Sequence, residues 1–185
     1  MEVSTLNLHA EIIERCRTGD EIAQYEIYRL YSRAMFNTAQ RICGNREEAE
    51  DVLQEAFLSA FRNISSYREE ATFGAWLKRI VVNKAITALK RNQKETIMIE
   101  EVHGEYIESG DSEFGEGVLS VEQIKEGINQ LPNGFRSVLS LYLFEGYDHK
   151  EISEILGISE STSKSQYKRA KDKLKSILEK EVKYG

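Results

Sequence analysis

Residues 146–170 read GYDHKEISEILGISESTSKSQYKRA, and this stretch predicts two short helices joined by a tight turn. Ile152 and Ile155 give the first helix an apolar side. Gly157 is suited to the left-handed conformation that ends a helix, and Ser159 is suited to cap the next helix by accepting from its free N–H groups. The combination is typical of a helix-turn-helix, whose second helix enters the major groove of DNA.

The second helix of this motif is predicted to have two unlike faces. At 100° per residue, an inward arc of mainly apolar and small side chains holds Ser163, Tyr167, Ala170, Leu174, Ile177 and Leu178. The opposite arc, basic and hydroxyl-bearing, holds Ser161, Lys164, Ser165, Lys168, Lys171 and Lys175. Residues 160–180 contain seven Lys or Arg against three acids, in a chain of net charge −6. Such concentrated charge favours a DNA partner, although an ordinary solvated helix can show the same pattern.

Composition excludes several other classes of protein. The chain has 185 residues, of which 41% are apolar and one is Pro, so we expect a folded and mainly helical protein of one or two small domains. Two Cys and three scattered His provide neither a disulfide framework nor metal-ligand spacing. Neither a phosphate-binding glycine loop nor a Cys/His or Ser/His pair in catalytic context is present, so we expect no enzyme and no cofactor. No apolar run approaches membrane-spanning length and no leader is seen, so we expect a cytoplasmic protein without membrane insertion.

An acidic segment divides the chain. Residues 93–122 contain nine acids against one Lys, a local net charge of −8, together with four Gly and no sustained periodicity. This composition predicts a flexible linker. We therefore expect an all-α protein with two small helical domains at 1–92 and 119–185, joined by an acidic linker at 93–118.

Two helices with different faces are predicted in the first half of the N-terminal domain. Asp20 is suited to cap a helix that ends at Gly44. The next helix has an apolar stripe at i, i+3 and i+4 spacing, formed by Val52, Leu53, Ala56, Phe57, Ala60, Phe61 and Ile64. On its opposite face Leu58 lies in a row with charged residues such as Asp51 and Glu55. An exposed Leu among charges indicates a protein-docking surface, although single exposed Leu residues are also normal.

A third helix is predicted to begin near Thr72 and to carry a basic face. Phe73, Leu77, Ile80 and Val81 point inward, and the neighbouring face holds Trp76, Arg79, Asn83 and Lys90, with Lys84 and Arg91 nearby. Residues 62–91 contain seven bases against two acids. Aromatic and basic groups interleaved on one helix suit single-stranded or melted DNA, because bases stack on rings and phosphates pair with cations. A Trp in such a position is more often a core residue, so the basic row and not Trp76 supports this interpretation.

Two separate blocks of this sequence resemble one family. Residues 49–57, AEDVLQEAF, and 73–83, FGAWLKRIVVN, look like the second domain of bacterial extracytoplasmic-function sigma factors. Residues 131–139, LPNGFRSVL, together with the helix-turn-helix, are similar to the fourth domain of the same family. Both blocks occur in the family's order and at its spacing, so the resemblance covers nearly the whole chain.

The resemblance implies an alternative sigma factor that directs core RNA polymerase to promoter DNA and is controlled by an anti-sigma factor. The residues expected to bind core polymerase are Asp51, Gln54, Glu55 and Leu58. Those expected to read and open the minus-ten element are Trp76, Arg79, Asn83, Lys84 and Lys90. Those expected to contact the minus-thirty-five element are Ser161, Thr162, Lys164, Ser165, Lys168 and Arg169. The alternative is a conventional helix-turn-helix regulator with an N-terminal sensing or dimerisation domain; the acidic linker and the second basic helix argue against it.

Three positions depart from the family pattern. Thr87 stands where many members carry Asp, Ser163 where Val is usual, and Gln166 where Arg is common. Because Ser163 lies on the inward arc, its hydroxyl must find a partner or weaken the packing by about 1 kcal/mol. We therefore expect the minus-thirty-five preference to differ from the family norm.

Overall fold

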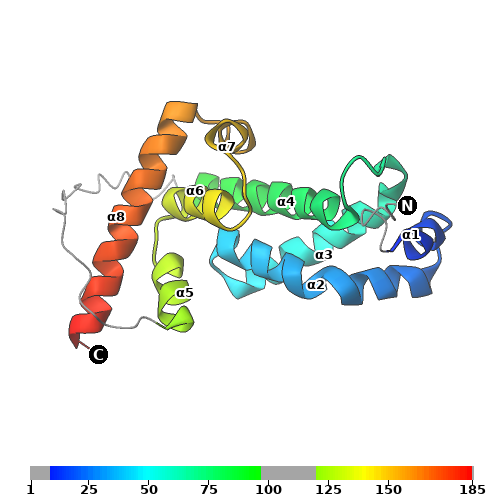
Figure 1. Cartoon of the computed structure of the whole chain (residues 1–185), viewed down its shortest axis with the longest axis horizontal. Coiled ribbons are helices and arrows are strands. Elements are labelled where there is room, and N and C mark those ends of the chain that lie inside the picture. The colour runs from blue at the N-terminus through cyan, green and yellow to red at the C-terminus, as the bar shows by residue number, and fades with distance from the viewer. Residues whose placement is uncertain (1–8, 97–119, 185) are drawn as a thin grey trace, which may run out of the picture. The chain divides into compact units, whose positions relative to one another are not determined.

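The computed structural model describes the backbone of residues 9–96 and 120–184, and the side chains of 9–92 and 120–180 (Figure 1). All regular structure within these ranges is helical, which confirms the predicted all-α class. The chain divides into two compact units, Met1–Ala88 and Leu89–Gly185. The helix that begins at Phe73 continues to Thr96, past the domain boundary expected at residue 92. Residues 97–118 of the expected linker lie outside the described residues.

The described part of the first unit consists of helices of different lengths. They are α1 (Ala10–Arg17), α2 (Glu21–Cys43), α3 (Arg46–Arg62), the short 3₁₀ turn η2 (Ile64–Ser66) and the start of α4 (Phe73–Thr96). Helix α2 lies alongside α3, and a tight turn joins the two helices (Figure 1). The predicted stripe of α3 is buried almost throughout, so this helix presents its opposite face to solvent.

Local caps explain where these helices begin and end. The Asp20 carboxylate accepts hydrogen bonds from the backbone N–H groups of Ile22 and Ala23, at 2.9 and 3.2 Å, and so caps α2 as predicted. Gly44 ends α2 with a left-handed φ of 70°. Asn45 then caps α3 by accepting from the N–H of Glu48. The loop between α2 and α3 is therefore specified by these short-range bonds.

Not every apolar residue of α2 faces the core. Ile27 is fully buried, whereas Ile22 and Tyr25 are 66% and 62% exposed. The Arg29 guanidinium lies 6.0 Å from the centroid of the Tyr25 ring. Apolar content along α2 is therefore a poor guide to which of its sides is buried.

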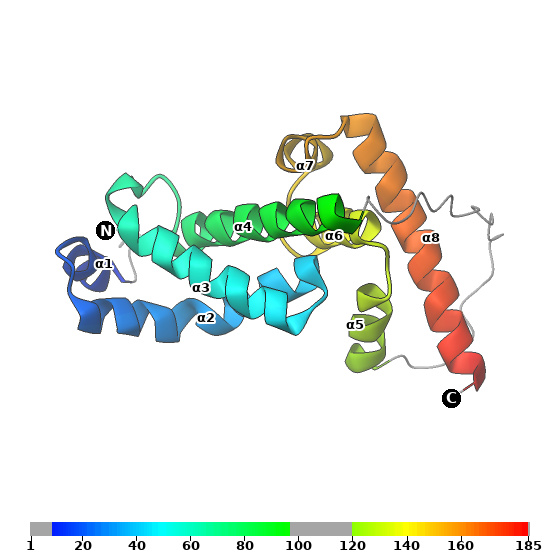
Figure 2. The ribbon, with the colours of Figure 1, turned by 180° about the vertical axis from the view of Figure 1, so that it is seen from behind.

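Beyond the end of α4, the described part of the second unit contains four helices. They are α5 (Val121–Asn129), α6 (Asn133–Leu143), α7 (His149–Leu156) and α8 (Glu160–Tyr184). Figure 2 shows α8 as the long helix against which the other three pack. Their common core contains Ile128, Leu131, Leu139 and Ala170. The predicted inward arc of α8 thus meets α5 and α6.

A buried arginine holds the turn between α5 and α6. Arg136 is buried, and its guanidinium donates to the carbonyls of Asn129 and Leu131 at 3.2 and 3.1 Å and to the side chain of Asn133 at 2.6 Å. The Asn129 carbonyl belongs to the last turn of α5, where backbone acceptors have no helical partner, and the Leu131 carbonyl lies in the turn that follows. Arg136 therefore satisfies the end of one helix while it packs within the next.

Candidate protein and nucleic-acid interfaces

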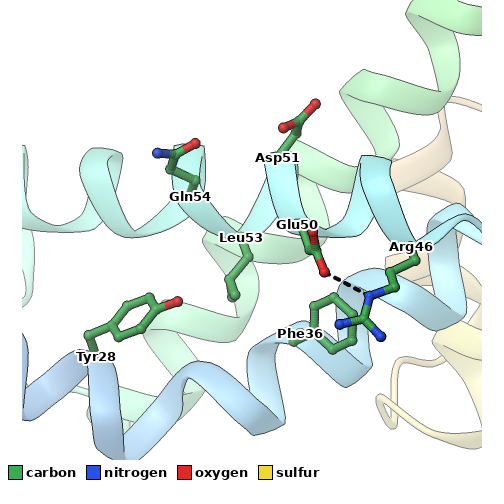
Figure 3. A pocket seen from close by; sticks show the side chains of 7 residues that line it. All are labelled: Tyr28, Phe36, Arg46, Glu50, Asp51, Leu53 and Gln54. Carbon is green, nitrogen blue, oxygen red and sulfur yellow. Dashed lines mark hydrogen bonds and ion pairs between the residues drawn. The ribbon is translucent and has the colours of Figure 1, made fainter.

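The α3 residues predicted to bind polymerase form an exposed row. Asp51, Gln54 and Glu55 are exposed, and Leu58 is 50% exposed. Figure 3 shows Asp51 and Gln54 on the side of α3 away from α2, whereas Leu53 points toward α2. The predicted row is thus brought together on one accessible face, while the apolar stripe fills the other.

A cavity of about 670 Å³ opens beside this row, between α2 and α3. Its lining is part aromatic and part charged, and consists of Tyr28, Phe36, Arg46, Glu50, Asp51, Leu53 and Gln54 (Figure 3). Arg46 donates to Glu50 at 2.8 Å, and its guanidinium lies 5.9 Å from the centroid of the Phe36 ring. Tyr28 and Phe36 were not predicted as site residues, because their place beside the row depends on how α2 packs against α3.

The basic face predicted on α4 is accessible. Arg79, Asn83 and Lys90 are exposed, and Lys84 is partly so. Thr72 caps this helix by accepting from the N–H of Ala75 at 3.2 Å. The cap specifies where α4 begins, and the burial of Phe73, Leu77 and Val81 leaves the basic face toward solvent.

Trp76 takes part in an aromatic cluster. Its ring centroid lies 5.4 Å from that of Tyr67 and 5.3 Å from that of Phe73, and the residue is only partly exposed. Part of the Trp76 side chain is therefore buried against other rings, as expected for a core residue. Base stacking by Trp76 stays a prediction, limited to the part of the ring that solvent reaches.

The loop before α4 is held by several contacts that the sequence did not predict. An Arg17 N–H donates to the Tyr67 carbonyl at 2.8 Å, and the Tyr67 hydroxyl donates to the Ala71 carbonyl at 2.8 Å. Glu69 has a φ of 62°, a left-handed conformation that is unusual for a residue other than Gly. The helix α1 thus helps to fix a loop that borders the basic face of α4.

The helix-turn-helix has the predicted geometry. Gly157 is left-handed with a φ of 71°, and the Ser159 hydroxyl accepts from the Thr162 N–H at 3.0 Å. A capping box between Asp148 and Glu151 starts α7. These caps are the ones the sequence predicts, apart from the box at Asp148.

The DNA-facing residues predicted on α8 lie mostly in solvent. Those exposed are Ser161, Lys164, Ser165, Lys168 and Arg169. Thr162 is partly buried, and its hydroxyl lies 2.8 Å from that of Ser159. The Lys164 ammonium lies 2.6 Å from Glu160 and, through this bond, lowers the pKa of the Glu160 carboxyl below its ordinary value. The residues predicted to contact DNA are therefore accessible, and Lys164 among them is ion-paired with Glu160.

The three departures from the family pattern have distinct surroundings. Ser163 is fully buried, and its Oγ lies 2.9 Å from Nδ1 of His149, so its hydroxyl has found a partner. Thr87 is exposed and donates to the Asn83 carbonyl one turn earlier, at 2.8 Å. Gln166 is partly buried close to Gly134.

Comparisons with known proteins agree with this geometry. The Sigma-70 region 2 model matches residues 27–95, which span α2 to α4, and the Sigma-70 region 4 model matches 122–174, which span most of α5 to α8. The ECF RNA polymerase sigma factor SigW of Bacillus subtilis is 30% identical over 176 residues, covering 90% of this chain and 94% of that protein. This chain belongs to the ECF sigma factor family. The predicted resemblance is confirmed.

Other relatives and solved structures are similar to this sigma factor. SigM of Mycobacterium tuberculosis H37Rv, also an ECF RNA polymerase sigma factor, is 30% identical over 170 residues, covering 91% of this chain and 84% of that protein. The Bartonella quintana sigma factor RpoE, solved with the anti-sigma factor NepR, has a TM-score of 0.56 and 23% identity over 83% of this chain and 95% of its own. CnrH, solved with the cytosolic domain of CnrY, has a TM-score of 0.50 and 19% identity over 91% and 95%. These two structures support the fold.

Within the described ranges, no helix of this sigma factor combines the length and apolar character needed to cross a membrane. The same ranges hold no group of three or more His, Cys, Asp or Glu side chains arranged to bind a metal ion. Its family consists of transcription initiation factors.

Proposed function

We propose that this ECF sigma factor binds core RNA polymerase through the exposed row of α3 and directs it to promoters through α4 and α8. The proposal rests on one observation. In each of the two units one helix, α4 or α8, has an exposed basic face opposite a buried apolar face. A regulator that reads one duplex site needs one such face. Two faces of different character suit a protein that reads a duplex element and a melted element.

The two DNA faces differ in chemistry. The α8 face combines Lys164, Lys168 and Arg169 with hydroxyls near the start of the helix, which suits base edges and phosphates in a major groove. The α4 face combines Arg79, Lys84 and the amide of Asn83 with the exposed part of Trp76, which suits an unpaired strand. We assign α8 to the minus-thirty-five element and α4 to the minus-ten element.

The exposed row of α3 suits contacts with a protein partner. Asp51, Gln54 and Glu55 offer acceptors and an amide around the exposed Leu58, and the neighbouring cavity offers aromatic walls. An apolar centre with a polar rim is the usual anatomy of a protein interface. The polymerase carries out RNA synthesis, while this chain binds, places the enzyme and holds the opened strand.

Control by an anti-sigma factor follows from the same surfaces. Two structures similar to this chain are complexes, one of RpoE with the anti-sigma factor NepR and one of CnrH with the cytosolic domain of CnrY. A protein that covers the α3 row would prevent polymerase binding. We place the functional boundaries at 1–92 and 119–185, with an acidic linker at 93–118, and we place the protein in the cytoplasm with its polymerase.

Reconstitution tests this function. Core polymerase with this chain should select promoters from a pool of randomised duplexes and make abortive and run-off transcripts from them, whereas core polymerase alone should not. The helix-turn-helix regulator alternative predicts that the chain binds a specific duplex without polymerase and yields no initiation. A matched control is the double variant Lys168→Ala/Arg169→Ala, which should retain polymerase binding and lose promoter selection.

A further inference from the structure

A histidine and a buried serine connect the two helices of the helix-turn-helix. His149 is the first residue of α7, and Ser163 lies near the start of α8. The distance from His149 Nδ1 to Ser163 Oγ is 2.9 Å, and the Ser163 side chain is fully buried. A buried hydroxyl is costly without a partner, so this bond favours one arrangement of α7 against α8.

Aromatic rings hold the histidine in place from two sides. The His149 ring stacks on Tyr142 of α6, with centroids 4.6 Å apart and an angle of 20° between the planes. It meets the Tyr167 ring of α8 edge-on, at 5.6 Å. Tyr142 and Tyr167 also contact each other, with centroids 4.5 Å apart. Three helices thus converge on one imidazole ring, which leaves little freedom to its Nδ1 atom.

The position of this bond matters because of what surrounds Ser163. Thr162 and Lys164, both assigned to DNA reading, are its neighbours in sequence and project from the same turn of α8. A hydrogen bond is directional, whereas an apolar contact tolerates small slides and rotations. A sub-ångström shift of this turn would move the base-reading side chains out of hydrogen-bond range.

We propose that His149 and Ser163 form a positioning pair that sets the approach of α8 to the minus-thirty-five element and thereby contributes to sequence discrimination. This inference rests on the proposed function of α8. The pair acts through its neighbours and does not itself touch DNA. Its effect is therefore on discrimination between sequences and not on general affinity for phosphates.

The test uses the holoenzyme formed from the full chain and core polymerase, and a duplex selected by the wild-type holoenzyme from a randomised pool. His149→Phe keeps a ring between the two tyrosines and removes the hydrogen bond. Ser163→Ala removes the hydroxyl, and Ser163→Val replaces it with the apolar residue usual in the family. His149→Asn is the conservative variant, because its amide lies near the position of Nδ1. Dissociation constants are measured for the selected duplex and for a scrambled one.

We expect His149→Phe, Ser163→Ala and Ser163→Val each to reduce the ratio of selected to scrambled binding by about fivefold, the effect of one net hydrogen bond. Binding to the scrambled duplex should stay within about twofold, because phosphate contacts are spread over several cations. The double variant His149→Phe/Ser163→Ala should lose no more than either single variant. His149→Asn should retain most of the discrimination. In the wild type, ring ¹⁵N spectra of labelled histidine should show a hydrogen-bonded Nδ1 that changes in Ser163→Ala.

A purely structural role predicts a different pattern. If Ser163→Val kept full discrimination, or if all variants lost selected and scrambled binding in equal proportion alongside their melting temperature, the positioning role would be wrong. Additive losses in the double variant would also overturn it. If instead the wild-type holoenzyme selected no sequence at all, the proposed function itself would fail, and this inference with it.

Discussion

The Lys84 ammonium lies 3.6 Å from a carboxylate oxygen of Glu55, so an exposed ion pair joins α4 to α3. One partner was predicted to contact DNA and the other to contact polymerase. The two predicted surfaces therefore meet at this pair. A polymerase group that binds Glu55 would release Lys84 for phosphate, although an exposed pair of this kind is worth at most about 1 kcal/mol.

Glu55→Gln should raise the affinity of the free protein for a single-stranded minus-ten oligonucleotide by up to about fivefold at low salt, because Lys84 loses its competing carboxylate. The gain should shrink between about 50 mM and about 200 mM salt as screening increases. Fluorescence anisotropy measures the affinity of each variant at each salt concentration. The matched control is Glu50→Gln, which removes the same charge from α3 but frees Arg46. Equal gains in both variants would show a general charge effect and no specific role for the pair.

Leu58→Lys should abolish co-purification with core polymerase and leave the helical content and the melting temperature nearly unchanged. The reason is that this side chain is 50% exposed on the face of α3 opposite the buried stripe. Leu53→Lys is the contrasting variant, since Leu53 is buried and a charge there should unfold the first unit. Unaltered co-purification of Leu58→Lys would place the docking surface elsewhere.

Asn83→Ala should slow or abolish promoter opening and leave binding to the upstream duplex intact. Permanganate footprinting of the opened strand is the measurement. Thr87→Ala is a suitable control, because Thr87 is exposed one turn further along α4 and its hydroxyl bonds only to the main-chain carbonyl of Asn83 among the described residues. Equal permanganate reactivity for Asn83→Ala and the wild type would show that this face does not hold the melted strand.

Lys164→Ala should weaken binding to the minus-thirty-five duplex by about 1–3 kcal/mol if its ammonium reaches a base edge. Part of the free energy gained from this contact is offset, because the ion pair between Lys164 and Glu160 must open when DNA binds. Lys173→Ala removes the same charge from the opposite side of α8 and should have little effect. Gel-shift titrations with single base substitutions would locate the base. Uniform weakening across all sequences would identify a phosphate contact instead.

Asp20→Ala should lower the melting temperature at neutral pH by removing the cap of α2, and its effect should fade in acid. Bonding to Arg15 and to the backbone N–H groups of Ala23 and Ile22 holds the pKa of the Asp20 carboxyl below its ordinary value in the folded protein. The stability that this carboxylate contributes is therefore fully present above the pKa that the Asp20 carboxyl has in the unfolded chain. It is lost as the pH falls through the lower pKa that the same carboxyl has in the folded protein. The melting temperatures of the wild type and of Asp20→Ala, measured from neutral pH to strong acid, should converge as the pH falls. Asp20→Asn, which keeps a capping oxygen, should lose less at neutral pH.

Short-range features of the sequence were sufficient for several of the helix boundaries. The cap at Asp20, the left-handed Gly44 and Gly157, and the cap at Ser159 are all as predicted. Each depends on atoms a few residues apart, so the local sequence specifies them almost completely. The buried stripe of α3 and the inward arc of α8 also follow from periodicity, because each helix has one continuous apolar side.

The sequence by itself thus determined an all-α protein, the caps of α2 and α8, the faces of α3 and α8, and the family to which it is similar. Only the tertiary structure decided that Ile22 and Tyr25 of α2 face solvent, that Glu55 pairs with Lys84, and that Ser163 finds His149. The physical reason is the range of the interactions involved. Caps and periodicity act within a helix, whereas these contacts join side chains on different helices. Such contacts exist only once the cores have set the angle and register of the helices.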